Sequence, residues 1–465
     1  MNELESAVAR HMQELARWAA GAQFDDLPST VQRKSALVIA DDLAAMVGAR
    51  DEPEIRAYHE GVLARAQCRE STVFCGRGLR ADRYSAAVAN AVAGDWLELD
   101  EGYRKLSCHA GLYVVPALLA EAEAENVPVH EVLRAVAISY EVVTRIARAF
   151  TPADEAIHSH ANYSAIGASA AIASVRRLGA QAFLDALSAA CTYCFAGPRS
   201  HVIKGALVRN TWPAIGAWSG MMSVEWARCG ITGLTESAYD ALAGALHATP
   251  HPARLTAALG AEWAILDGYT KIYACCQHAH SSVEATLAVR EQLLPRNTLN
   301  SIGEITVEAH ALAMKLSNAH PATTLAAKFS MPHIVAAALT FGNAGARSFY
   351  SDTLAHSGIA ALRNLVRLTA YARYAADAPE LDPPNDRPAR VVVRLRDGSL
   401  LAAECLSAAG GPDRPFGDDA LMAKIGELTA GPYPRFASVM HGIIELDRRQ
   451  LARGWRDVVA EFCEP

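Results

Sequence analysis

The sequence predicts a mainly α-helical protein with an α+β insertion, in which a large helical domain is built from both chain ends. Ala, Leu and Val recur at three- and four-residue spacing from Leu4 to about Leu266, the pattern of packed helices. After Lys271, short segments with the character of strands appear, and helical patterns return after Gly410. We therefore expect three segments: a helical domain over 1–268, an α+β lid domain over 269–409 and a helical return over 410–465.

Two predicted helices of the first segment carry no charge at all. Tyr163–Ser174 and Trp212–Val224 consist of apolar and small residues throughout. A helix that is apolar on every side is buried on every side. These two helices therefore predict a large globular bundle rather than a small surface module.

The middle segment combines strands with helices. Val391–Arg396 and Ser399–Cys405 flank the dipeptide Asp397-Gly398, which is typical of a tight turn, so this stretch predicts a β-hairpin. The other elements predicted in this segment are strands over Ile305–Ala309 and Val366–Ala370, helices over Ser282–Leu293 and Met331–Phe341, and a polar, Pro-rich connector over Pro379–Pro388. In the helical return after Gly410, helices are predicted over Asp418–Leu428 and Ile443–Phe462.

Composition excludes several classes of protein. The 465 residues include 51% hydrophobic and 20% charged residues, which allows a large core and argues against disorder. A formal net charge of −7 without long Lys/Arg runs argues against nucleic acid or an anionic membrane as the partner. The sequence shows neither a signal peptide nor an apolar run of about 18 residues that could span a bilayer. We expect a cytoplasmic protein.

The ten cysteines do not indicate a disulfide framework, because they are scattered through a long chain, as in proteins of a reducing cytosol. Cys191 and Cys194 have the spacing of a redox pair, but they lie in an Ala-rich helical pattern, where a buried structural role is commoner. The adjacent Cys275 and Cys276 are a poor donor pair for tetrahedral zinc, and we expect no metal site.

Four short blocks hold most of the polar residues that could carry chemistry. Asp95–Gly111 places four acids, two bases and a histidine ahead of a predicted helix. His158–Ser164 opens an Ala- and Gly-rich helix, and helix N-termini attract anions. Pro198–Arg209 is basic and could hold a carboxylate or a phosphate. Lys271–His280 gathers one lysine, two histidines and two cysteines within ten residues.

Each block also has a plain structural interpretation. The first could be a solvated loop with a helix cap, the second a capping pair, and the third a loop that pairs with the acidic excess of the chain. The fourth favours a site, because a lysine and two histidines so close together are rarely all structural. The sequence has no Gly-rich phosphate loop, Gly-x-Ser-x-Gly or His-Glu-x-x-His. Their absence argues against nucleotide, serine-hydrolase and zinc-protease chemistry.

Five segments in the same order resemble the motifs of the MmgE/PrpD family, and the resemblance covers nearly the whole chain from about Leu27 to past Gly410. Asn90–Pro116 is similar to Asn…Asp-Phe-Asp-Asp-Thr…His-Pro…Pro, and His158–Gly167 to His-Pro-Thr-Gly-Thr…Gly. The other three are Lys204 at the position of a family lysine, Lys271–Cys275 for Lys-x-Tyr-Pro-x-Cys, and Asn318–Pro332 for Asn-x-Pro…Ala-Lys-Phe-Ser.

The resemblance implies a helical domain with an α+β lid, usually in a homodimer, and an active site between the domains that uses no cofactor. It implies small di- or tricarboxylic substrates, whose proton next to a carboxylate is moved before water or CO₂ is lost or a centre is inverted. Such chemistry needs an acid/base pair and several cations.

The resemblance also implies roles for individual residues. The implied catalytic residues, with the histidines as proton-transfer groups and the lysines as carboxylate binders or electrophiles, are Glu98, Asp100, His109, His158, Lys204 and Lys271. The candidate substrate-binding residues of the four blocks and the matching motifs are Tyr103, Arg104, Arg199, His201, Tyr273, His278, His280 and Lys328.

The chain departs from the family motifs in the first block. Residues 98–102 are Glu-Leu-Asp-Glu-Gly where the family has Asp-Phe-Asp-Asp-Thr, so a hydroxyl is missing, and Glu98 and Asp100 are alternative catalytic acids. We predict a cofactor-independent lyase of the dehydratase type. An epimerase or a decarboxylase on the same scaffold is the first alternative, and a non-catalytic relative is the second. Exchange of a substrate α-proton with D₂O would separate the enzymes from the non-catalytic relative.

Overall fold

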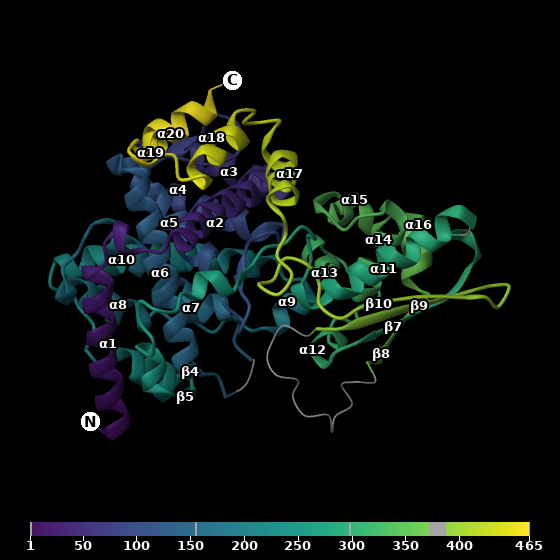
Figure 1. Ribbon diagram of the computed structural model, residues 1–465, viewed down its shortest axis with the longest axis horizontal. Coiled ribbons are helices and arrows are strands. Elements are labelled where there is room, and N and C mark those ends of the chain that lie inside the picture. Colours follow the sequence, from purple (N-terminus) through teal and green to yellow (C-terminus); the bar gives the residue numbers. More distant parts are fainter. Residues whose placement is uncertain (1, 154–155, 297–298, 372–386, 465) are drawn as a thin grey trace.

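The computed structural model describes residues 2–153, 156–296, 299–371 and 387–464. In Figure 1 a large helical body lies beside a smaller part in which helices accompany a sheet, and the C-terminal helices return to the helical body. The predicted fold class, mainly α with an α+β insertion, is confirmed. No helix among these residues is long and apolar enough to cross a membrane.

The N-terminal helical segment runs from α1 to α10. Its helices are α1 (Glu3–Gly21), α2 (Ser29–Gly48), α3 (Pro53–Leu63), α4 (Arg83–Trp96), α5 (Ala110–Glu125), α6 (Val129–Ala149), α7 (Ser159–Val175), α8 (Ala180–Cys191), α9 (Ser200–Lys204) and α10 (Trp212–Arg228).

Helix α7 is the central helix of this body and is buried along its whole length, as its lack of charge predicts. Helices α5, α6, α8 and α10 all pack on it. Gly216 and Gly220 of α10 lie so close to α7 that added β-carbons would be 2.0 Å from Ser164 Oγ and 2.5 Å from the Ala165 carbonyl oxygen. The small residues therefore let the two helices approach closely, and the N-terminal end of α7 has a fixed position in the core.

Three short two-stranded sheets interrupt the predicted helical stretch. They pair β1 (Ser71–Thr72) with β2 (Arg80–Ala81), β3 (Gly102–Tyr103) with β6 (Gly268–Tyr269), and β4 (Phe150–Thr151) with β5 (Thr249–Pro250). The pair β3–β6 matters most, because Gly102 lies opposite Tyr269 and Tyr103 opposite Gly268. It brings the first polar block beside the fourth, although more than 160 residues separate them in the sequence.

The α+β part is built on a four-stranded sheet in the order β10-β9-β7-β8. Its strands are β7 (Ile302–Ala309), β8 (Val366–Ala370), β9 (Ala389–Leu395) and β10 (Leu400–Cys405); β7 and β8 are parallel and the other pairs antiparallel. The predicted strands and hairpin are confirmed. Gly398 has φ +90° at the predicted turn, a value that favours glycine.

Helices accompany this sheet. The two predicted helices are confirmed as α11 (His280–Leu293) and α14 (Met331–Phe341). Four short helices were not predicted: α12 (Ala311–Met314), α13 (Thr324–Lys328), α15 (Ser351–Leu354) and α16 (Ser357–Arg363). Helix α11 packs on β9 and β10, and α14 packs on α11 and α16. Most of the predicted connector at 379–388 falls outside the described residues.

The chain end is helical, but one prediction about it is wrong. The helix expected over Ile443–Phe462 is divided among three elements, because Leu446 has φ +56° and Asp447 caps a new helix. The C-terminal helices are α17 (Asp418–Thr429), α18 (Phe436–Ile444), α19 (Arg448–Leu451) and α20 (Trp455–Cys463). Helices α17 and α18 pack on α2, and α20 packs on α5.

The chain leaves the helical body and returns to it at one place. The Thr270 amide donates a hydrogen bond to the Gly410 carbonyl oxygen at 2.9 Å, so the outgoing and returning segments lie side by side. Lys424 of α17 donates to Asp41 at 2.5 Å and to the Leu99 carbonyl oxygen at 2.8 Å. The returning helix thus supports the loop that carries the first polar block. We propose that the domain limits lie at this double crossing, near residues 268 and 410.

Candidate active site

The loop after α4 carries the first polar block into the interior. Helix α4 ends at Trp96, and Glu98 then takes the left-handed conformation, φ +55°, which turns the chain sharply. Such strain in a non-glycine residue is common at functional sites. Strand β3 follows, and its pairing with β6 places Lys271 beside Asp100.

Asp100, His109 and Lys271 form the centre of the site. His109 Nδ1 lies 2.6 Å from Asp100 Oδ2, and Lys271 Nζ lies 3.3 Å from Asp100 Oδ1. Burial alone would raise the pKa of Asp100, but the charges of Lys271 and His109 outweigh burial and hold that pKa well below its usual range. Asp100 is therefore a carboxylate and can only accept, so His109 Nδ1 is the donor. This bond leaves His109 Nε2 as the ring atom available for proton transfer.

His158 is held with the opposite polarity. It caps α7, and its Nδ1 accepts a hydrogen bond from the His160 backbone amide at 3.3 Å. Burial, and then the neighbouring His160, lower the pKa of His158 well below its usual value, so the ring is neutral. A neutral ring that accepts at Nδ1 carries its proton on Nε2. His158 therefore presents a hydrogen-bond donor.

Arg209 is the cation that the third polar block contributes. Its guanidinium donates to Asp95 Oδ1 at 2.7 Å and to Glu98 Oε1, and it lies over the ring of Phe329 at 5.8 Å. Burial raises the pKa of Asp95 to about 6, with the charge of Arg209 opposing the rise. Glu98 Oε2 also lies 3.7 Å from Lys271 Nζ, so Glu98 links the two cations.

These groups surround a cavity of about 260 Å³. Both the helical body and the α+β part line it. The residues that line it and were predicted from the sequence are Glu98, Tyr103, Arg104, His109, His158, Arg199, Lys271 and His278. Further lining residues include Arg209, Tyr269, Gln277, Leu312, Phe329 and Arg387. Asp100 does not line the cavity but contacts it through His109 and Lys271.

Two predicted residues of the third block lie elsewhere. Lys204 is exposed at the C-terminal end of α9 and does not line the cavity. His201 stacks against Trp212, with ring centroids 6.4 Å apart, and also does not line the cavity. Arg209, five residues after Lys204, occupies the place in the site that the sequence assigned to Lys204.

Three predicted residues of the α+β part lie behind the cavity wall. Lys328 is buried and donates to the Trp96 carbonyl oxygen at 2.7 Å, which ties α13 to the end of α4. Tyr273 packs edge-on against His280, with ring centroids 5.3 Å apart. His280 also bonds to the Cys275 carbonyl oxygen through Nε2. These contacts shape the loop that presents Lys271.

Sequence reasoning did not select Asp95, His160, Arg209 or Arg387. Asp95 lies in the last turn of α4 and Glu98 in the loop directly after it, so both acids come from one short segment. His160 lies within the first turn of α7 beside His158, so the pair of histidines was a usable signal. Arg387 follows the connector, and no motif marked it.

Comparison with known proteins identifies the chain. Residues 13–256 match the MmgE/PrpD N-terminal domain model, and residues 273–447 match the MmgE/PrpD C-terminal domain model. The chain belongs to the MmgE/PrpD family. A cis-aconitate decarboxylase from Aspergillus terreus is 26% identical over 358 residues, or 70% of this chain and 71% of the relative. A cis-aconitate decarboxylase-like protein, oryM, from Aspergillus oryzae is 24% identical over 447 residues, or 90% of each.

The cavity of this MmgE/PrpD protein is rich in cations. Besides Lys271 and Arg209, it is lined by Arg104, Arg199 and Arg387, together with His278. Burial, and then the charge of Arg104, lower the pKa of Arg387 to about 10, and no carboxylate lies at ion-pair distance from Arg387 among the described residues. Burial and Arg387 likewise lower the pKa of His310, which lies 5.3 Å from His278, to about 4. The cavity therefore favours an anion.

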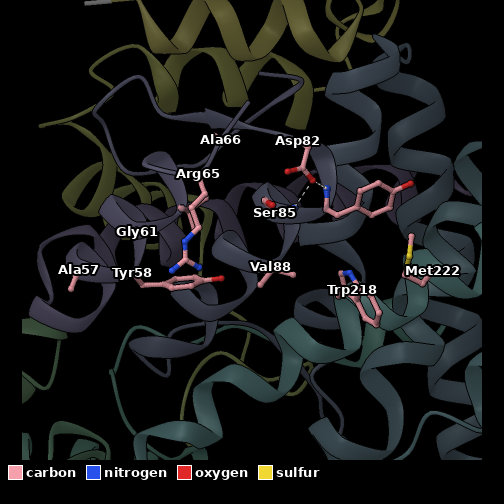
Figure 2. A pocket seen from close by; sticks show the side chains of 12 residues that line it. Ala57, Tyr58, Gly61, Arg65, Ala66, Asp82, Ser85, Val88, Trp218 and Met222 are labelled. Carbon is pink, nitrogen blue, oxygen red and sulfur yellow. Dashed lines mark hydrogen bonds between the residues drawn. The ribbon is translucent and has the colours of Figure 1, made fainter. Parts of the chain in front are cut away.

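A second cavity, of about 640 Å³, lies apart from this chemistry (Figure 2). Tyr58, Val88 and Trp218 line it, from α3, α4 and α10. Its carboxylate, Asp82, already caps α4 by accepting from the backbone amides of Tyr84 and Ser85. The described residues that line it include no histidine or lysine. The smaller cavity is therefore the better candidate for the active site, because of the two cavities only this one is lined by residues that can act as an acid/base pair.

Among the described residues, no group of three or more His, Cys, Asp or Glu side chains is placed to hold a metal ion. The ten cysteines are all free thiols.

A second pair of acids lies directly behind the site. Glu101 accepts from the Gly111 amide and from Tyr140 Oη, and its own amide donates to Asp42 Oδ1 at 3.2 Å. Burial raises the pKa of Glu101 from 4.5 to about 8. Burial, and then the Glu101 charge, raise the pKa of Asp42 well above its usual range. At a pH between 4.5 and about 8, Glu101 therefore holds a proton in the folded protein and releases it in the unfolded chain.

This proton predicts how stability depends on pH. Between pH 4.5 and about 8 the folded state binds more protons than the unfolded state, so the free energy of unfolding falls as pH rises through this window. The slope approaches about 1.4 kcal/mol per pH unit for one proton. Urea unfolding at a series of pH values measures it. Glu101→Gln is expected to flatten the fall, and an unchanged slope in this variant would contradict the assignment.

Proposed function

We propose that this protein is a cofactor-independent lyase of the dehydratase type, which acts on a small di- or tricarboxylic acid by abstracting a proton next to a carboxylate. The observation that supports this most directly is the opposite polarity of two histidines in one cavity. The Nε2 of His109 is the free ring atom of a histidine bonded to a carboxylate, and the Nε2 of His158 carries a proton. One can accept a proton while the other donates a hydrogen bond.

The proposed elimination needs only groups of this chain. His109 Nε2 takes the proton from the carbon next to a carboxylate, and the electron pair forms the new double bond. Lys271 and Arg209 hold the carboxylate on which charge develops. His158 Nε2–H donates a hydrogen bond to the β-hydroxyl of the substrate. His109 then gives the proton that it took to this hydroxyl, which leaves as water. Both histidines are then neutral again, as they were before the reaction.

Charge and size support a polycarboxylate substrate. Carboxylates already neutralise Lys271 and Arg209 in part. Arg104, Arg199 and Arg387 line the same cavity and add further positive charge to it. The cavity of about 260 Å³ suits a small acid rather than a larger metabolite.

A proton-NMR screen in D₂O tests this function. EDTA-treated protein would be mixed in turn with 2-methylcitrate, citrate, cis-aconitate, malate-like and aspartate-like acids. Loss of an α-proton signal with a new vinyl resonance is the expected result. Exchange without a new product would instead identify an epimerase. If no compound in the panel changed, the lyase assignment would be contradicted for this substrate class.

Decarboxylation is the second candidate, and the comparisons favour it: the similar proteins from Aspergillus are named cis-aconitate decarboxylase or as like it. In that reaction the C–CO₂ bond breaks, its electron pair stays on the acid, and a proton is delivered to that skeleton. The same cavity could supply the proton from a histidine. Release of ¹³CO₂ from carboxyl-labelled cis-aconitate would show that the reaction is a decarboxylation and not a dehydration.

Arg387 is expected to select for a second carboxylate. Loss of a charge-assisted hydrogen bond costs about 1.5–3 kcal/mol, so Arg387→Gln should raise the KM for a tricarboxylate about 10- to 100-fold. The KM for an analogue that lacks the remote carboxylate should change little. Lys105→Gln is the matched control, because Asp267 already pairs with Lys105 at the exposed rim, at 2.6 Å. Equal effects of Arg387→Gln on both compounds would contradict this role.

A further inference from the structure

A third histidine lies between the two that face the cavity. His160 is completely buried. Its ring meets His109 edge-on with centroids 4.8 Å apart and meets His158 in the same way at 4.3 Å. It does not line the cavity, so it cannot touch a substrate there. Its contacts reach the reaction only through the other two rings.

Both ring nitrogens of His160 have partners. Nε2 lies 3.1 Å from Asp95 Oδ1, and Nδ1 lies 2.8 Å from Tyr113 Oη. Asp95 also accepts from Arg209 at 2.7 Å, an ion pair that favours its carboxylate form. A neutral His160 therefore donates from Nε2 to Asp95 and accepts at Nδ1 from the tyrosine hydroxyl. Tyr113 Oη also lies 3.2 Å from Ser159 Oγ, and because the shorter bond to His160 uses the single tyrosine proton, the serine hydroxyl is the donor there. The two bonds of His160 determine both the orientation of the ring and its tautomer.

The charged surroundings keep this ring neutral. The groups that face it are Asp95 at the end of α4, Tyr113 of α5, Asp100 and His109 of the loop, His158 of the α7 cap, Arg209 and Lys271. Burial, and then Arg209, lower the pKa of His160 well below its usual value. A proton on His160 would also lie near two fixed cations.

We propose that His160 is a positioning residue for the proton transfer: Asp95 and Tyr113 lock its neutral ring between His109 and His158, and that ring keeps the two Nε2 atoms directed into the cavity and their protons separate. This inference rests on the proposed function for the roles of His109 and His158. It adds a residue whose effect passes through them. If His160 only filled space, its hydrogen bonds to Asp95 and Tyr113 would be unnecessary. If it only satisfied Asp95, its ring contacts with His109 and His158 would be unnecessary.

The first test needs no substrate. In ¹⁵N-histidine-labelled wild-type protein, long-range ¹H–¹⁵N correlation spectra report which ring nitrogen is protonated, and single-histidine variants assign the signals. At pH 7 we expect Nε2–H for His160, Nδ1–H for His109 and Nε2–H for His158. An Nδ1–H tautomer or a charged ring at His160 would overturn the proposal, whether or not a substrate has been found.

Two variants then separate positioning from structural roles. His160→Gln keeps a donor at the Nε2 position for Asp95 but removes the ring, and His160→Phe keeps the ring but removes both bonds. On a confirmed substrate, we expect both to lower kcat about tenfold or more, to leave KM within about twofold, and to move the pH profile of kcat/KM.

Either variant can overturn the proposal. A wild-type pH profile in His160→Gln would mean that His160 only satisfies Asp95, and a wild-type profile in His160→Phe would mean that it only fills space. Circular dichroism and thermal unfolding show whether each variant is folded. If neither variant folds, the tautomers of the wild-type protein decide.

Discussion

Replacing His109 by asparagine is expected to lower kcat by two to four orders of magnitude, about the contribution of a general base. The asparagine amide can stand where Nδ1 stands and still donate to Asp100, so the buried carboxylate keeps a partner. What disappears is Nε2, the ring nitrogen that is not bonded to Asp100. The KM should change little, because Lys271 and the arginines that line the cavity remain. Steady-state kinetics on a substrate found by the NMR screen measures both constants.

His201→Asn is the matched control, because His201 does not line the cavity. It removes an imidazole that stacks on Trp212, and it should leave kcat within about twofold. Turnover by His109→Asn at the wild-type rate would place the general base on another residue. If exchange of the substrate α-proton survived in His109→Asn while product formation did not, His109 would serve the leaving group instead.

The general plan of this molecule could be predicted from local patterns. Charge-free helices, alternating strands and the Asp397-Gly398 turn each depend on residues that are neighbours in sequence, and the structure confirms them. The error near the C-terminus is also local. The residues around Leu446 and Asp447 break a pattern whose apolar spacing continues on both sides. The spacing of apolar residues alone does not reveal where one helix ends and the next begins in a new direction.

The site was predictable only as a set of blocks. The motifs identify which segments meet, but the β3–β6 pairing decides which side chains do, and that pairing joins residues far apart in sequence. Lys204 and Arg209 illustrate this limit. Both are basic and lie in one block, yet the end of α9 and the left-handed Gly205 expose the first and bury the second. Glu98 and Asp100 were alternatives in sequence, whereas in space both lie near Lys271.

Replacing Lys271 by methionine is expected to cost about 3–5 kcal/mol of unfolding free energy, the cost of breaking a buried ion pair by removing one partner. Lys271 is 1% exposed and lies 3.3 Å from Asp100 and 3.7 Å from Glu98. Methionine fills much of the same space, so the loss is that of charge rather than of packing. The ammonium is also what holds Asp100 ionised, and activity on any substrate should disappear. Urea unfolding and the NMR assay measure the two effects.

A second substitution shows whether charge is the cause. Asp100→Asn in the Lys271→Met background removes the carboxylate that has lost its lysine partner. It should restore part of the lost stability, because the effects of substitutions within one network are not additive. Lys204→Met is the matched control, since the same change on an exposed lysine should alter stability by no more than about 0.5 kcal/mol. If Lys204→Met abolished turnover while Lys271→Met kept it, the sequence assignment of Lys204 would be correct and the cavity described above would not be the active site. Equal stability of the single and double variants would mean that Asp100 takes up a proton when Lys271 is lost, and its titration in the single variant would then shift toward neutral pH.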